Sequence, residues 1–344
     1  RMLLSIIIPT YNEAENIKPF IVAIKKALKG YRNYEIIFVD DNSLDKTYNV
    51  VKKLSKIYKN VRCLRRIRRR GLASAVIEGS LSSSADLLLV MDADLQHDEK
   101  KIPKMLEIQK KYNLDVVIGS RFLNKSYSLG LSKKRNYISK FANLIATKIS
   151  GISLTDPMSG FFLIKRNIIE EQATHLTGLG FKILLDILSA TKNKLKYREI
   201  GFNFKKRMFG ESKLGTLVIW EYMLLLWETK FGRFIPARFI SFCIIGGTGV
   251  INHIFILYIL KNLNLKFIAA QSIATFSAMT GNFFLNNILT YRDRQKKGIQ
   301  ALKALMIFYV TCGLGAIANV GIANSLYLGE VNNVSLTWYI SGIV

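Results

Sequence analysis

The stretch Asp86-Leu-Leu-Leu-Val-Met-Asp-Ala-Asp-Leu-Gln-His97 predicts a buried strand that runs into polar side chains. Leu87 to Met91 is a short apolar run, typical of a parallel strand that is covered on both faces. Asp92, Asp94 and Gln96 follow at a spacing of two, so an extended backbone would place all three on one side. Two carboxylates and an amide oxygen are hard ligands, which suit Mg²⁺ or Mn²⁺ rather than Zn²⁺. The alternative is an ordinary acidic turn, and the spacing alone does not exclude it.

Strand and helix signals alternate on both sides of this stretch. Apolar runs that predict strands occupy residues 3–8, 35–39, 61–64 and 115–120, and helical patterns separate them. Such alternation predicts an α/β fold with a doubly wound, largely parallel sheet. Polar clusters follow most of these strands. Because the carboxyl ends of parallel strands meet at one edge, the clusters should converge where α/β sheets bind nucleotides, and a divalent ion held there could grip a diphosphate.

The composition combines a strong positive charge with high hydrophobicity. The 344 residues include 50 Lys and Arg against 24 Asp and Glu, a formal charge of +26, and 50% of them are hydrophobic. Nucleic acid, anionic lipid and a phosphorylated substrate are candidate partners of the basic surface. Since no nucleic-acid-binding motif occurs and much of the charge flanks apolar segments, we expect no nucleic acid. Cys63, Cys243 and Cys312 are far apart, which disfavours a disulfide framework.

The pattern changes after residue 130. Residues 133–149 and 213–231 predict amphipathic or aromatic helices at a membrane interface, although surface or core helices would have similar patterns. Three longer segments then lack any charged residue and are long enough to span the hydrocarbon core. The expected organisation is an α/β domain over 1–232 and a transmembrane helical bundle over 233–344, with spans at about 239–260, 267–290, 304–328 and a truncated one at 336–344.

Basic residues are unevenly distributed over the loops between these segments. Residues 291–303, between the second and third spans, are strongly basic, whereas residues 329–335 contain no Lys or Arg. Lys230, Arg233 and Arg238 precede the first span. The positive-inside rule therefore predicts a multi-pass membrane protein with its first 230 or so residues on the cytoplasmic face.

Six motifs carry a resemblance to a known family. In order they are Pro9-Thr-Tyr-Asn-Glu13, Val39-Asp-Asp-Asn-Ser-Leu-Asp45, Met91-Asp-Ala-Asp-Leu-Gln96, Gly119-Ser-Arg121, Asp156-Pro-Met-Ser-Gly-Phe-Phe162 and Arg207-Met-Phe-Gly-Glu-Ser-Lys213. Together they resemble the inverting GT-A glycosyltransferases of family 2, most closely the polyprenyl-phosphate (dolichol-phosphate) mannose synthases. Gly71-Leu-Ala-Ser-Ala75 departs from the Gly-Leu-Gly that is usual there. In the membrane part, Gly246-Gly247 and Gly281-Asn-Phe-Phe-Leu-Asn-Asn287 resemble the GtrA-like domain.

This resemblance implies an activity. It is the metal-dependent, inverting transfer of mannose from GDP-mannose to dolichyl (polyprenyl) phosphate, with Mg²⁺ or Mn²⁺ as cofactor. The acceptor phosphate is already anionic, so no strong general base is required, and a cation must absorb the charge of the leaving diphosphate. Two alternatives stay open: a UDP-glucose-dependent polyprenyl-phosphate glucosyltransferase, because no single residue selects the donor, and a lipid-linked sugar transporter that works through the membrane spans. A transporter should show an intramembrane charge or a broken helix pair, and the sequence makes neither evident.

The resemblance also implies roles for individual residues. Pro9, Tyr11, Glu13, Val39 and Asp41 would hold the donor nucleoside, and Asp92 and Ala93 would lie beside its ribose and diphosphate. Asp94 and Gln96, together with Asp92, would hold the metal. Arg207 and Lys213 would close over the donor diphosphate. Arg121, Arg135 and Ser139 would bind the acceptor phosphate, and with Asp94 they form the implied catalytic set.

Overall fold

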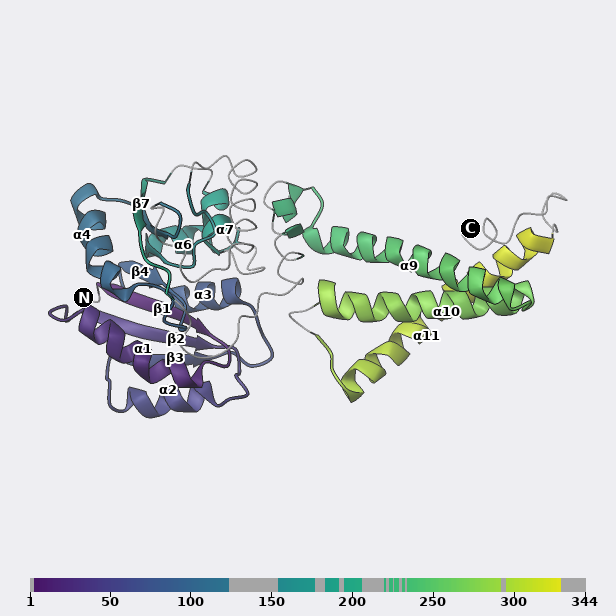
Figure 1. Ribbon diagram of the computed structural model, residues 1–344, viewed down its shortest axis with the longest axis horizontal. Helices are drawn as coiled ribbons and strands as arrows, with labels where there is room; N and C mark the ends of the chain where they lie inside the picture. Colours follow the sequence, from purple (N-terminus) through teal and green to yellow (C-terminus); the bar gives the residue numbers. More distant parts are fainter. Residues whose placement is uncertain are drawn as a thin grey trace. The chain divides into compact units, whose positions relative to one another are not determined.

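The computed structural model divides the chain into two compact units, Arg1–Phe234 and Ile235–Val344. Each unit is described by itself (Figure 1). The structure describes residues 3–123, 154–176, 183–191, 195–205, 220, 223–224, 226–228, 231–232, 234–291 and 295–328. The predicted interface helix at 133–149, most of the one at 213–231 and the short span at 336–344 lie outside these residues.

The first unit is built on a seven-stranded sheet with the order β3-β2-β1-β4-β6-β5-β7. The pairs β1–β2, β2–β3, β1–β4 and β5–β7 are parallel, whereas β6 lies antiparallel between β4 and β5. The predicted α/β fold with a largely parallel sheet is therefore confirmed. The strands are β1 (Leu4–Thr10), β2 (Tyr34–Asp40), β3 (Val61–Arg65), β4 (Leu87–Val90), β5 (Val116–Ser120), β6 (Phe162–Lys165) and β7 (Tyr197–Gly201).

Helices cover both faces of this sheet, because alternate side chains of each strand point to opposite faces. In β1, Ile6 and Ile8 pack in the core under α1, α2 and α4, whereas Ile7 packs in the core under α3, α6 and α7. Gly79 of α3 lets this helix approach closely, since a Cβ there would lie 2.7 Å from side-chain atoms of Ile7 and Val39. The helices are α1 (Ala14–Ala27), α2 (Thr47–Ser55), α3 (Leu72–Leu81), η1 (Glu99–Lys101), α4 (Ile102–Tyr112), α6 (Arg166–Gln172) and α7 (Ile183–Ala190).

The second unit is helical, and its helices fall on the first three predicted spans. They are α9 (Ala237–Asn262), α10 (Phe267–Leu285), which continues into the π-helix η2 (Asn286–Thr290), and α11 (Ile299–Leu328). Among the described helices, α9 and α11 are long and apolar enough to cross a membrane. Polar side chains within them bond between helices, as in the contacts Ser241–Thr290, Asn252–Ser277, His253–Thr275, Gln271–Asn319 and Thr280–Tyr309. Such bonds satisfy polar groups that lipid cannot solvate.

Candidate active site

The loops after β1 and β2 are joined by hydrogen bonds at the carboxyl edge of the sheet. The backbone N–H of Asn12 donates to the Ser43 hydroxyl at 2.9 Å, and the Leu44 N–H donates to the Asn12 side chain at 3.0 Å. The Ala14 N–H donates to Asp45 at 2.9 Å. Asn12 has a φ of +56°, a left-handed conformation that asparagine tolerates better than most residues. The two loops therefore form one fixed surface.

The residues expected to hold the nucleoside lie on or behind this surface. Pro9, Tyr11 and Glu13 are half-buried at the end of β1. Val39 is fully buried and packs on the face that α3 covers, so its side chain does not line the edge. The alternation of β2 explains this position, because the neighbouring Asp40 points to the opposite face.

Asp41 is a buried carboxylate directly after β2. It accepts the backbone N–H of Gly71 at 2.8 Å, and its other oxygen lies 3.2 Å from Nε of the buried Arg66. That second contact is an ion pair whose angle does not fit a hydrogen bond, so Asp41 Oδ1 has no aligned donor among the described residues. Burial raises the pKa of Asp41, although the Gly71 hydrogen bond and the Arg66 charge act in the opposite direction. An unaligned buried oxygen at this edge fits an N–H donor of a bound base.

The chain does not stay extended after β4, and this corrects the geometry that the sequence suggested. The strand ends at Val90, a turn includes Ala93 and Asp94, and Leu95 has a φ of +61°. Such a φ is costly for a branched side chain, and outliers of this kind cluster at functional sites. The turn closes on itself through the Gln96 N–H, which donates to Asp94 Oδ1 at 3.1 Å. The predicted ligands thus lie in and beside a tight turn and not on an extended strand.

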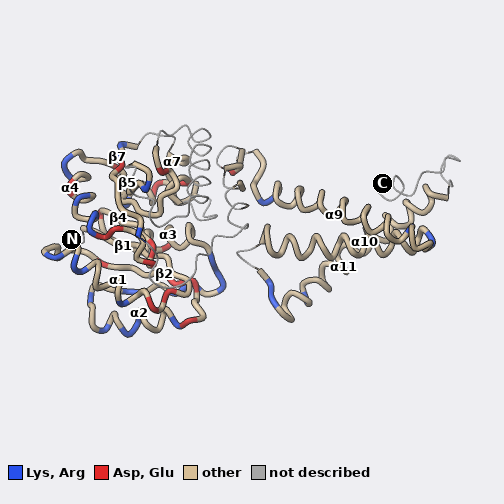
Figure 2. Tube along the Cα trace, viewed as in Figure 1, with Lys and Arg blue, Asp and Glu red and all other residues tan. Residues whose placement is uncertain are grey.

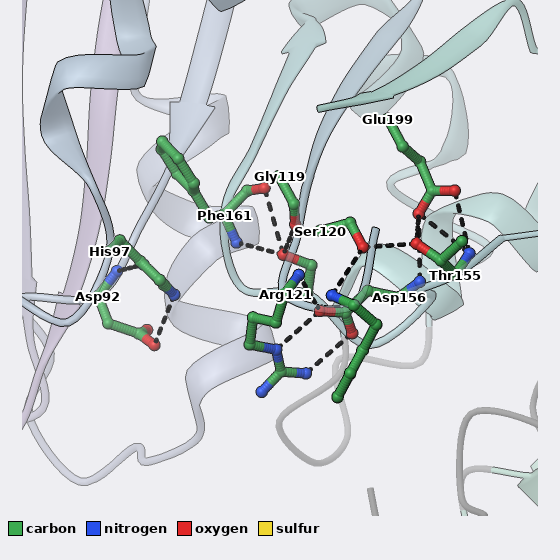
Figure 3. Close-up of polar contacts among 11 residues, drawn as sticks. Asp92, His97, Gly119, Ser120, Arg121, Thr155, Asp156, Phe161 and Glu199 are labelled. Atoms are coloured by element: carbon green, nitrogen blue, oxygen red, sulfur yellow. Dashed lines mark hydrogen bonds and ion pairs between the residues drawn. The ribbon is translucent and has the colours of Figure 1, made fainter. Parts of the chain in front are cut away.

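His97 ends the turn and ties it to an aromatic cluster. Its Nδ1 accepts the backbone N–H of Asp92 at 3.1 Å, and its Nε2 lies 3.8 Å from the Asp92 carboxylate (Figure 3). The ring stacks on Phe161 with centroids 5.3 Å apart and meets the edge of Phe202 at 5.7 Å. Burial lowers the pKa of His97 to about 4, so the ring is neutral near pH 7 and Nδ1 can accept a hydrogen bond.

Gly160 makes this arrangement sterically tight. A Cβ at that position would lie 3.3 Å from Asp92 Oδ2 and 3.5 Å from His97 Cε1. Bare backbone of the Asp156–Phe162 motif therefore packs against the Asp92 turn. This contact joins two motifs that are more than sixty residues apart in the sequence.

Arg121 emerges from β5 and is held by a bidentate pair with Asp156. Its Nε and Nη2 donate to the two carboxylate oxygens at 2.7 and 2.8 Å (Figure 3). Asp156 is fully buried, whereas 16% of the Arg121 side chain is exposed. Burial would lower the pKa of Arg121, but the charge and hydrogen bonds of Asp156, with the charge of Asp92, hold that pKa above its usual value. Arg121 is thus a permanently charged group whose side chain is mostly buried but keeps some exposed area.

Glu199 on β7 holds the loop that carries Asp156. Its carboxylate accepts the Thr155 N–H at 3.0 Å, the Thr155 hydroxyl at 2.8 Å and the Asp156 N–H at 3.1 Å (Figure 3). The neighbouring hydroxyl of Ser120 also contacts Thr155. Strands β5 and β7 thereby orient Asp156, which in turn orients Arg121.

The structure therefore places some of the predicted site residues together and leaves others outside the described residues. Asp92, Asp94 and Gln96 share one turn, and Arg121 lies within electrostatic range of Asp92. Arg135, Ser139, Arg207 and Lys213 lie outside the described residues. Sequence reasoning assigned no role to His97, Asp156, Glu199 or Arg66. The first two stand inside quoted motifs, which could have pointed to them, but no signal marks Glu199 or Arg66.

The oxygen ligands at the β4 turn fit a divalent cation. Asp94 is buried, and 39% of the Asp92 side chain is exposed. The Gln96 amide nitrogen donates to the Lys205 carbonyl at 3.0 Å, which leaves the amide oxygen as the end available to a cation. The described residues contain no group of three or more His, Cys, Asp or Glu side chains that could hold a metal alone. Two carboxylates fit Mg²⁺, which binds few protein carboxylates and completes its shell with water and substrate phosphates.

Similar proteins support the same interpretation. Residues 5–172 match the Glycosyl transferase family 2 model, and residues 241–344 match the GtrA/DPMS transmembrane domain. A dolichol-phosphate mannosyltransferase of Pyrococcus furiosus is 37% identical over 327 residues, which cover 92% of this chain and 89% of the relative. The enzyme of the same name from Saccharomyces cerevisiae is 34% identical and covers 69% of this chain and 92% of its own length.

Solved structures agree on the fold. Glucosyl-3-phosphoglycerate synthase from Mycobacterium tuberculosis, in complex with Mn²⁺, uridine diphosphate and phosphoglyceric acid, superposes with a TM-score of 0.51 at 17% identity. The match covers 67% of this chain and 79% of that one. With the sheet topology, the β4 turn and the two family matches in agreement, the chain belongs to the dolichol-phosphate mannosyltransferase family of family 2 glycosyltransferases, and it is a membrane protein with a GtrA/DPMS transmembrane domain.

Proposed function

We propose that this enzyme transfers mannose from GDP-mannose to dolichyl or another polyprenyl phosphate, with release of GDP. The observation that supports this most strongly is the likeness to dolichol-phosphate mannosyltransferases along 92% of the chain, joined to a carboxylate turn beside a charged arginine. The C1–O bond to the diphosphate breaks, and a new bond forms between C1 and an oxygen of the acceptor phosphate. In-line attack inverts the configuration at C1.

In this proposal Asp92, Asp94 and Gln96 would hold Mg²⁺ or Mn²⁺, and the ion would supply charge stabilisation for the leaving diphosphate. His97 keeps the turn in place through the Asp92 N–H. The buried Asp41 faces the nucleoside with an oxygen that has no aligned donor among the described residues. Arg207 and Lys213 close over the diphosphate.

Arg121 binds the acceptor phosphate in this proposal, together with Arg135 and Ser139. Asp156 uses two N–H groups of Arg121 and so fixes the plane of the guanidinium. The remaining N–H groups suit the oxygens of a phosphate, which arginine binds in a fork geometry. Since the phosphate is an anion before it attacks, no side chain has to remove a proton from it.

The acceptor lipid requires the reaction to take place at the headgroup level of a bilayer. We infer that the catalytic domain, residues 1–232, lies on the cytoplasmic face. Lys and Arg are concentrated just before the first span and in residues 291–303, and such basic segments stay in the cytoplasm. The membrane domain over 233–344 would then keep the enzyme in the bilayer that contains the lipid phosphate.

A donor panel tests this function. Purified full-length protein in detergent is incubated with dolichyl phosphate and labelled GDP-mannose, GDP-glucose, UDP-glucose or UDP-N-acetylglucosamine, and lipid-linked product is measured. We expect GDP-mannose to be preferred by at least about tenfold in kcat/KM, equal to roughly 1.4 kcal/mol. A preference for UDP-glucose would instead identify a polyprenyl-phosphate glucosyltransferase.

The metal is tested by a matched pair of variants, one after β4 and one before it. Asp94→Asn keeps the size of the side chain but removes a charged ligand, so turnover should fall by at least about a hundredfold, and chelation of the wild type should abolish it until Mg²⁺ or Mn²⁺ is restored. Asp86→Asn, at the opposite end of β4, is the control and should retain turnover. Wild-type turnover by Asp94→Asn would contradict the metal assignment.

A further inference from the structure

A basic loop follows β3 at the edge of the sheet that carries the candidate active site. Residues 66–70, Arg-Ile-Arg-Arg-Arg, lie between β3 and α3 and are here called the arginine loop (Figure 2). Because β2 and β3 are parallel, this loop leaves the sheet beside Asp41, which follows β2. The metal and acceptor roles proposed for Asp92, Asp94 and Arg121 do not involve the exposed side chains of this loop.

Arg66 anchors the start of the arginine loop inside the protein. It is buried, its Nε lies 3.2 Å from Asp41 Oδ1, and its Nη2 donates to the Ser74 hydroxyl at 2.8 Å. The residue after the loop, Gly71, donates its N–H to Asp41 Oδ2 at 2.8 Å. Both ends of the loop are thus bound to one carboxylate. Within the loop, the Arg70 guanidinium lies 4.6 Å from the centroid of the Tyr11 ring.

The tip presents an apolar side chain beside exposed guanidiniums. Ile67 is 62% exposed, and residues 68–70 are three exposed arginines. Arg68 has a φ of +61°, which is unfavourable for a residue other than glycine. Arg69 pairs with Glu78 at 3.0 Å. Among the described residues Glu78 is the only carboxylate in an ion pair with these three, so the tip keeps a net positive charge.

We propose that the arginine loop docks on an anionic lipid surface, with Ile67 in the membrane interface and Arg68 and Arg69 on lipid phosphates. This inference rests on the proposed function, because a lipid-phosphate acceptor requires this edge of the sheet to face the headgroups. Apolar residues flanked by cations are typical of interfacial anchors, and arginine binds phosphate oxygens in a fork geometry. Each such arginine strengthens attraction to an anionic surface by about fivefold. Docking holds the donor site at the depth of the acceptor phosphate.

The test measures membrane depth at two exposed isoleucines. Ile67→Cys and, as the control, Ile57→Cys are made in full-length protein whose native cysteines at 63, 243 and 312 are replaced by serine, and each is labelled with an environment-sensitive fluorophore. Ile57 is 71% exposed and lies before β3, at the opposite end of that strand from Ile67. The proteins are placed in nanodiscs of phosphatidylcholine, with or without phosphatidylglycerol, that contain lipid spin-labelled near the headgroup.

We expect the fluorophore at position 67 to be quenched at least about twofold more than the one at 57 in nanodiscs with phosphatidylglycerol, and less in phosphatidylcholine alone. Adding Arg68→Gln and Arg69→Gln should bring the quenching at 67 down toward the level at 57. Equal quenching at both positions would overturn the proposal. The proposal would also be overturned if the fluorescence at position 67 changed on addition of GDP-mannose with metal but not with anionic lipid, since the loop would then belong to the nucleotide site. The measurement needs no turnover, so its failure is distinct from a failure of mannose transfer.

Discussion

Replacing His97 with phenylalanine separates two contributions of this ring. His97→Phe keeps an aromatic ring that can stack on Phe161, where the centroids are now 5.3 Å apart, but removes the Nδ1 that accepts the Asp92 N–H at 3.1 Å. His97→Asn does the converse, because an amide oxygen can take the position of Nδ1 while the ring is lost. The two variants therefore test whether the hydrogen bond or the ring packing of His97 holds the turn after β4 in place.

The expected magnitude follows from the burial of this site. His97 is 3% exposed, so the Asp92 N–H would lose its partner where little water can replace it. Leaving a buried donor unpaired costs about 1–3 kcal/mol, which corresponds to roughly 5- to 150-fold in an equilibrium. The loop after β4 can avoid this cost by shifting so that the Asp92 N–H reaches another partner, but the shift also displaces the proposed metal ligands. In His97→Phe, kcat/KM for the donor should therefore fall by about 10- to 100-fold. The midpoint of thermal unfolding should change less, because the ring still fills the aromatic cluster.

The assay combines donor kinetics with thermal unfolding and Mn²⁺ affinity for both variants. His97→Asn should show the opposite pattern, with a lower unfolding midpoint from the lost ring but kcat/KM per folded molecule within about threefold of the wild type. Weaker Mn²⁺ binding should appear in His97→Phe only. Wild-type kinetics of His97→Phe, or losses in both variants that simply follow the unfolding midpoint, would refute a role of His97 in positioning the metal turn.

Two further predictions concern the acceptor site and the domain division. Arg121→Lys cannot form the bidentate pair with Asp156, so the acceptor KM should rise or kcat should fall by at least about tenfold while the donor KM stays unchanged. Acceptor titrations at saturating donor measure this, and unchanged acceptor kinetics would contradict the role. A protein of residues 1–232 alone should fold and bind GDP with Mg²⁺ by calorimetry, because the sheet and the β4 turn lie within it. Loss of nucleotide binding in that protein would contradict separable domains.

Local patterns in the sequence were enough to predict the strands, the polar residues that follow β4 and the long apolar helices. Apolar runs between polar ends placed β1 to β5 within a few residues of their observed bounds. Charge-free segments coincided with α9, α10 with η2, and α11. Asp92, Asp94 and Gln96, the proposed metal ligands, were also visible, because residue type and a spacing of two can be read from the sequence. Periodicity and residue type are local properties, and a sequence displays them directly.

Only the tertiary structure decided which distant segments meet. The insertion of β6 between β4 and β5, the bidentate Arg121–Asp156 pair and the support from Glu199 each join residues at least 35 positions apart. The turn at Leu95 replaced the extended geometry because Asp94 and His97 bond to the backbone of their own loop. Local pattern could not predict these features, because the pairing of remote strands and the partner of a buried charge depend on how the whole core packs.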